Sequence, residues 1–89
     1  MINKSELQAQ ITVVLKYLEE NYQKNERYGV LELIYNRYRN ALQLLDNDTA
    51  NKDNLNILGG TRAYMDSYSD YSNPLLNEMY KAEKLAKQL

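Results

Sequence analysis

The fold is decided most clearly by residues 73–89, which read NPLLNEMYKAEKLAKQL. Asn is a preferred N-cap residue and Pro a preferred first residue of a helix, so the pair Asn73-Pro74 marks a helix start. After it, apolar residues recur at steps of four and three, the spacing of one helix face: Leu75, Met79, Ala82, Ala86 and Leu89. Lysines gather in the second half, where positive charge suits the helix dipole. We therefore expect a helix over 74–88.

The same spacing recurs near the start of the chain and predicts a helix over 5–23. Ser5 and Gln8 are placed as a capping box, and Asn3 with Glu6 offers the same chemistry two residues earlier. The apolar stripe consists of Leu7, Ile11, Val14, Leu18 and Tyr22, and Val13 and Leu15 widen it. A stripe of that width predicts a helix that contacts two neighbours.

A second apolar stripe predicts a helix over 27–45. Its members are Leu31, Ile34, Tyr38, Leu42 and Leu45. Asn25 precedes the stripe and is a suitable N-cap. The polar run 46–49 ends the pattern.

The third segment holds two competing signals. Its stripe is Ile57, Thr61, Tyr64, Tyr68 and Tyr71, which again steps by four and three. Gly59-Gly60 lies in the middle, and two glycines inside a helix cost roughly 2 kcal/mol together. Either one helix covers 52–71 and the glycines allow another backbone to approach closely, or a helix begins at Thr61 after a turn. We favour the single helix over 52–71.

These helices and their short connections predict an all-α fold, a small antiparallel four-helix bundle in a single domain over 1–89. If the glycine pair breaks the third helix, the alternative is a three-helix bundle with a Gly-Gly turn. Leftover apolar stripe makes a homodimer possible.

The composition excludes most catalytic chemistry. The chain has nine Tyr but no His, Cys, Trp or Phe. Without His and Cys it lacks the usual general base, the thiolate nucleophile and the common ligands of zinc. We therefore expect no catalytic residue, no metal site, no cofactor and no enzymatic activity.

Charge and hydropathy indicate where the chain works. Eleven basic and twelve acidic residues give a net charge of −1, which argues against nucleic acid as a partner. No stretch approaches the ~20 apolar residues of a membrane span. We expect a cytoplasmic protein without a transmembrane segment.

The most unusual local composition lies in segment 64–71. It predicts a partner-binding surface composed of Tyr64, Asp66, Tyr68, Asp70 and Tyr71, in which tyrosines supply affinity and aspartates attract a cationic partner. The alternative interpretation is structural. In it, the tyrosines form the core side of a surface helix and the aspartates its solvated side.

Basic residues suggest a second, different function. Arg37, Arg39 and Arg62 would serve a phage-type or transcription-accessory nucleic-acid-binding protein if the fold brought them into one stripe. Tyr35 and Tyr38 would then stack on bases. In the alternative interpretation, these tyrosines belong to the core and the arginines to the solvated surface.

In size, helical class and charge balance, the chain resembles small bacterial bacteriocin-immunity proteins, which are four-helix bundles, and small helical antitoxins. The resemblance implies a protein partner and assigns no site residues. Together with the composition, it predicts a non-enzymatic helical module for protein–protein interaction, of the immunity or antitoxin type.

Overall fold

A computed structural model describes residues 4–22, 29–47, 55–67 and 73–88. These residues form four helices and no strand, which confirms the all-α class. The helices are α1 (Lys4–Asn21), α2 (Val30–Asp46), α3 (Gly60–Ser67) and α4 (Pro74–Ala86).

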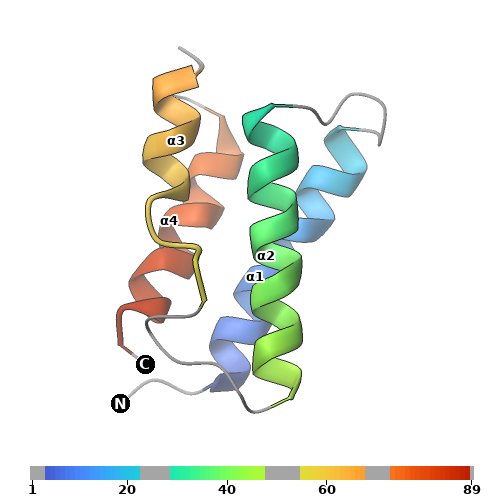
Figure 1. The fold of residues 1–89 in the computed structure, drawn as a ribbon, viewed down its shortest axis with the longest axis vertical. Coiled ribbons are helices and arrows are strands. Elements are labelled where there is room, and N and C mark those ends of the chain that lie inside the picture. The colour runs from blue at the N-terminus through green and yellow to red at the C-terminus, as the bar shows by residue number, and fades with distance from the viewer. Residues whose placement is uncertain (1–3, 23–28, 48–54, 68–72, 89) are drawn as a thin grey trace.

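The helices alternate in direction around a closed ring. In Figure 1, α1 and α3 run upward, whereas α2 and α4 run downward. Each helix packs against its neighbour in the chain, and α1 also packs against α4. This is the antiparallel four-helix bundle that the spacing predicts.

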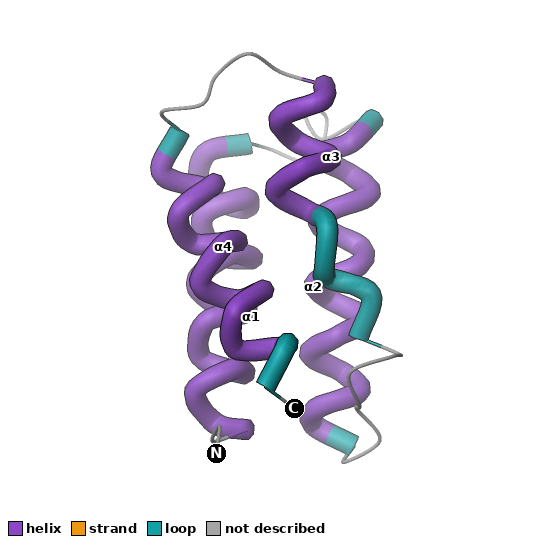
Figure 2. The backbone as a smooth tube through the Cα atoms, turned by 90° about the vertical axis from the view of Figure 1, so that its left-hand side faces the viewer, coloured by secondary structure: helices purple, strands orange, loops and turns teal. Residues whose placement is uncertain are grey.

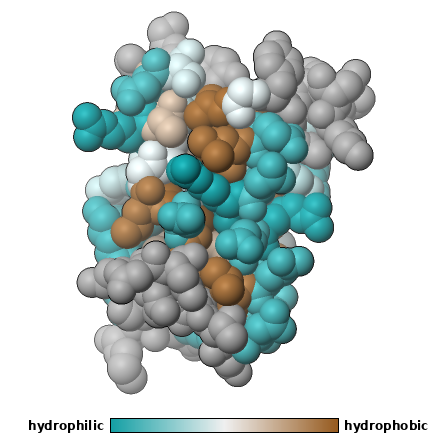
Figure 3. Space-filling model, viewed as in Figure 1, coloured by the Kyte–Doolittle hydropathy of each residue, from teal (hydrophilic) through white to brown (hydrophobic). Residues whose placement is uncertain are grey.

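The core takes side chains from all four helices. Most of the expected stripe residues are buried: Leu7, Ile11, Val14 and Leu18 of α1, Leu31, Ile34, Tyr38 and Leu45 of α2, and Leu75, Met79, Ala82 and Ala86 of α4. Tyr22 and Leu42 are only partly buried against this core, and Leu89 lies outside the described residues. Burying a side chain of Leu size contributes about 1.5–3 kcal/mol, so these stripes supply most of the driving force. The expectation that Val13 belongs to the buried stripe is wrong, because its side chain is 43% exposed. Over the face formed by α2 and α3, exposed apolar patches are separated by polar side chains (Figure 3).

The helix starts differ in how well local sequence marks them. The Asn73 cap is confirmed, since its Oδ1 accepts a hydrogen bond from the Leu75 amide at 2.9 Å. The capping box at Ser5 is wrong, because α1 begins at Lys4 and places Ser5 inside the first turn. Asn3 and Asn25, the other proposed caps, lie outside the described residues.

The continuous helix over 52–71 is also wrong. Helix α3 begins at Gly60, and the loop before it follows a non-helical path (teal in Figure 2). Leu55 and Ile57, two residues apart, are both buried, and Asn56 between them has a φ of 63°. Gly59 has a φ of 91°, a conformation that favours glycine. The turn of the alternative interpretation is therefore present, yet α3 still provides a fourth helix.

Candidate protein-binding groove

The first residue of the surface expected at segment 64–71, Tyr64, is buried in the structure. Tyr64 is only 3% exposed, and its hydroxyl accepts a hydrogen bond from Asn73 Nδ2 at 2.9 Å inside the bundle. Its ring therefore acts as core, as the structural interpretation expects for it. Asp66 is exposed. Tyr68, Asp70 and Tyr71 lie outside the described residues.

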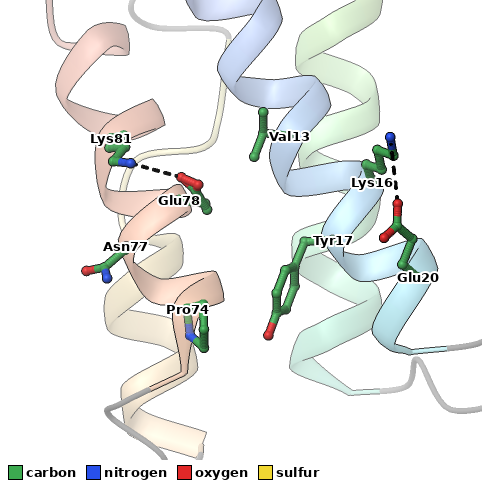
Figure 4. Close-up of a pocket in the computed structure, with 8 residues that line it drawn as sticks. All are labelled: Val13, Lys16, Tyr17, Glu20, Pro74, Asn77, Glu78 and Lys81. Carbon is green, nitrogen blue, oxygen red and sulfur yellow. Dashed lines mark hydrogen bonds and ion pairs between the residues drawn. The ribbon is translucent and has the colours of Figure 1, made fainter.

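A hollow lies instead between α1 and α4, with a volume of about 470 Å³ (Figure 4). Its lining comes equally from the two helices: Val13, Lys16, Tyr17 and Glu20 from α1, and Pro74, Asn77, Glu78 and Lys81 from α4. Val13 points into the gap from α1, and the Tyr17 ring lies between the helices (Figure 4). The apolar part of the hollow thus comes from the flank of α1 that faces α4.

A second hollow of about 320 Å³ continues along the same seam and shares Lys81 with the first. Its other lining residues are Gln10, Lys84, Leu85 and Gln88. Gln10 spans the seam, since its Nε2 donates to the Glu78 carbonyl at 2.9 Å and lies 3.4 Å from the Glu78 carboxylate. We call the two hollows together the α1/α4 groove.

The two ends of the α1/α4 groove differ in charge. Both carboxylates of the first hollow are paired, Glu20 with Lys16 at 3.8 Å and Glu78 with Lys81 at 3.2 Å. Such exposed pairs add little stability, because water screens them. The second hollow has two lysines and no carboxylate in its lining. Because Lys81 is paired with Glu78, the excess positive charge at this end comes from Lys84.

Asn73 fixes the floor of the groove. Its Oδ1 accepts hydrogen bonds from the Leu75 amide and, at 3.0 Å, from the Tyr17 hydroxyl. Its Nδ2 donates to the hydroxyls of Tyr22 and Tyr64 at 3.0 and 2.9 Å. These four bonds use both donors and both acceptor positions of the amide. Sequence reasoning found only the cap, because the tyrosine partners come from α1, the residue after it, and α3.

A second buried polar group lies on the other flank of α4. The Glu83 carboxylate, 8% exposed, accepts hydrogen bonds from the Gly59 amide at 3.1 Å and the Thr61 amide at 2.9 Å. Burial, with a smaller contribution from the negative charge of Glu83, raises the pKa of the Tyr38 hydroxyl far above its usual range. Tyr38 therefore stays protonated at neutral pH, and its hydroxyl oxygen lies 3.5 Å from the Met79 carbonyl oxygen.

The three arginines do not form one stripe. Arg37 and Arg39 lie about 200° apart around α2, since each residue turns the helix by about 100°. The guanidinium carbon of Arg39 lies 5.8 Å from the Tyr35 ring centroid, beside α1, whereas Arg62 belongs to α3. The Tyr35 hydroxyl donates to Glu19 at 2.7 Å, and Tyr38 is core. This arrangement does not favour the nucleic-acid interpretation.

Two further observations concern the described residues alone. No group of three acidic side chains among them is placed to hold a metal ion. None of the helices in these ranges combines the length and apolar character that crossing a bilayer requires.

The fold and its groove define a small helical bundle with a preformed interhelical surface. The chain belongs to the YeeD family, because residues 2–89 match the model described as "YeeD uncharacterised protein". It is 33% identical over 95 residues to the "Uncharacterized protein YeeD" of Bacillus subtilis (strain 168), an alignment that covers 99% of this chain and 93% of that protein. No solved structure matches the chain.

Proposed function

We propose that this chain is a non-enzymatic protein-binding module whose α1/α4 groove receives an amphipathic helix of a partner protein. The observation that carries the proposal is the preformed groove, with an exposed Val13 beside a Tyr17 ring that Asn73 holds in place. Helix-in-groove recognition uses such a floor, because it removes apolar side chains from water without rearranging the receptor.

The charges of the groove favour an acidic occupant. Lys81 and Lys84 line the second hollow; Lys81 is paired with Glu78, so Lys84 supplies the excess positive charge. Carboxylates on the partner helix would lie near these lysines, while its apolar side chains would contact Val13, Tyr17 and Leu85. Charge complementarity of this kind mainly speeds association and fixes the orientation of the helix.

Within this class, we propose a cytoplasmic role of the immunity or antitoxin type, in which the bundle neutralises a partner protein. Its support is the resemblance in size, helical class and charge balance. The earlier expectation of a cationic partner on Asp66 is the competing proposal, and one experiment separates the two.

The experiment starts with the natural partner, captured by the tagged full-length chain from the cells that encode it. Its affinity is then measured for purified variants. Val13→Asp should weaken binding at least tenfold, because it places a charge on the apolar floor. Leu33→Asp is the matched control, since Leu33 on α2 is 42% exposed and Val13 is 43% exposed. Thermal melts establish that both variants fold.

Charge reversal distinguishes the acidic from the cationic partner. Lys81→Glu with Lys84→Glu should slow association, whereas Arg39→Glu with Arg62→Glu, an equal change of charge away from the groove, should not. If Asp66→Lys abolishes binding while the groove variants bind normally, the surface at segment 64–71 is the interface. Capture of nucleic acid, or a homodimer that Val13→Asp dissociates, would overturn the proposal of a partner helix.

A further inference from the structure

Helix α3 differs from the other three helices in what stabilises it. Between Gly60 and Ser67 it buries only two residues, Gly60 and Tyr64, fewer than any of the other three helices. Most helical stability in proteins comes from packing of a buried face, so α3 receives less of it than the other helices. The residue before α3 is Gly59, which has no side chain to cap the first turn. Its helical structure therefore depends on contacts from outside.

The beginning of α3 is held by Glu83 of α4. Each oxygen of this carboxylate accepts one amide hydrogen, from Gly59 and from Thr61. The negative charge also lies where the helix dipole is positive, which strengthens both hydrogen bonds. Glu83 thus acts as an N-cap supplied from a residue more than twenty positions away.

The second half of α3 is held by a neutral contact. Tyr64, one turn from the start, reaches Asn73 through its hydroxyl at 2.9 Å. Together the two contacts attach α3 to α4 and to the residue that caps α4. The Tyr64 ring also packs in the core, so Tyr64→Phe would remove the hydrogen bond and keep the apolar contact.

Beneath α3 lie two large core side chains. A Cβ atom on Gly60 would be 3.8 Å from Tyr38 Cε1 and 3.9 Å from Met79 Sδ. Helix α3 therefore covers the part of the core between α2 and α4. The longer helices do not depend on it in the same way, because α1 packs against both α2 and α4.

We propose that α3 is a latch that opens as a unit while α1, α2 and α4 stay packed, and that Glu83 sets how often it opens. Opening brings Tyr38 and Met79 to solvent and uncovers the surface between α2 and α4. This surface lies on the flank of α4 away from the α1/α4 groove. The latch and the proposed docking site share one residue, because Asn73 contacts both Tyr64 of α3 and Tyr17 of the groove.

Amide hydrogen exchange on the full-length chain, followed by NMR at increasing urea, tests the latch. Amides of residues 63–67 should exchange through an opening with little urea dependence, whereas central amides of α1 and α4 should show the full dependence of global unfolding. Glu83→Gln should speed exchange in α3 about tenfold or more, because one amide loses its acceptor and the other keeps only a neutral one. Exchange in α1 should change much less.

Glu78→Gln is the matched control, since it neutralises a partly exposed carboxylate on the same helix and should leave α3 unchanged. Tyr64→Phe should also speed exchange in α3, whereas Tyr80→Phe, at an exposed tyrosine, should not. If wild-type α3 exchanges with the same rates and urea dependence as the core of α4, the latch does not exist. That comparison needs no variant, so it decides the question even if Glu83→Gln fails to fold.

Discussion

A single amide, that of Asn73, joins three helices. It caps α4 through Leu75, contacts α1 through Tyr17 and the following Tyr22, and contacts α3 through Tyr64. A buried amide that lost these partners would leave several hydroxyl groups unsatisfied, and each such group costs about 1–3 kcal/mol. Replacing Asn73 should therefore destabilise the fold more than replacing an ordinary N-cap residue.

Replacing Asn73 tests this role. Asn73→Ala should lower the free energy of unfolding by about 2–4 kcal/mol, the sum of a lost cap and unpaired tyrosine hydroxyls. Asn73→Ser keeps a capping oxygen and should fall between wild type and Asn73→Ala. Urea denaturation provides the measurement, with Asn77→Ala as the exposed control on α4. Wild-type stability for Asn73→Ser would show that the tyrosine contacts contribute nothing beyond the cap.

At the scale of elements, the glycine pair shows two different constraints. Gly59 has a φ of 91° but nothing lies within 4 Å of an added Cβ, so its constraint is conformational. Gly60 has an ordinary helical backbone, and an added Cβ would meet neighbours only at van der Waals distance. The expectation that both glycines permit close helix packing is therefore not supported for a side chain as small as Ala.

The two positions should respond in opposite directions to alanine. Gly59→Ala should destabilise the chain by about 1 kcal/mol or more, because Ala disfavours a positive φ. Gly60→Ala should be neutral or should stabilise by about 0.4–1 kcal/mol, since it reduces the entropy of the unfolded chain. Gly60→Leu should still destabilise by about 1–3 kcal/mol, because a long side chain would overpack Tyr38 and Met79. A higher melting temperature for Gly59→Ala than for Gly60→Ala would contradict the conclusion that only Gly59 is constrained by its backbone conformation.

The helices that the sequence predicts well are those with a long, regular stripe of apolar residues. Helices α1, α2 and α4 have long stripes, and their buried residues follow these stripes closely. The start of α3 is not predictable in this way, because it depends on Glu83, 24 residues from Gly59. The groove was missed for a related reason. Val13 lies on an apolar flank, and only the position of α4 decides that the flank stays exposed.

At the scale of the whole molecule, Tyr38 makes the stability of the fold depend on pH in the alkaline range. Burial raises the pKa of its hydroxyl, so the native state keeps a proton that the unfolded state releases above about pH 10. The contribution of protonated Tyr38 to the free energy of unfolding is therefore fully present below about pH 10 and is lost as the pH rises further. The slope reaches at most about 1.4 kcal/mol per pH unit.

Urea denaturation between pH 9 and pH 11 measures this coupling. Stability should fall with pH in this window, and Tyr38→Phe should make the fall shallower by up to the slope of one proton. Tyr80→Phe removes an exposed tyrosine and should leave the slope as in wild type. Identical slopes for Tyr38→Phe and Tyr80→Phe would show that Tyr38 ionises without unfolding the chain.

The contact between α1 and α4 has a consequence for synthesis on the ribosome. Helix α1 is made before the other three described helices, yet one of its two neighbours is α4, the last of the four to be made. At about 5–20 residues per second, several seconds separate the completion of α1 from that of α4. During this time the stripe from Leu7 to Leu18 lacks its final cover. The α1 stripe therefore stays open to aggregation and to chaperones until α4 has been made.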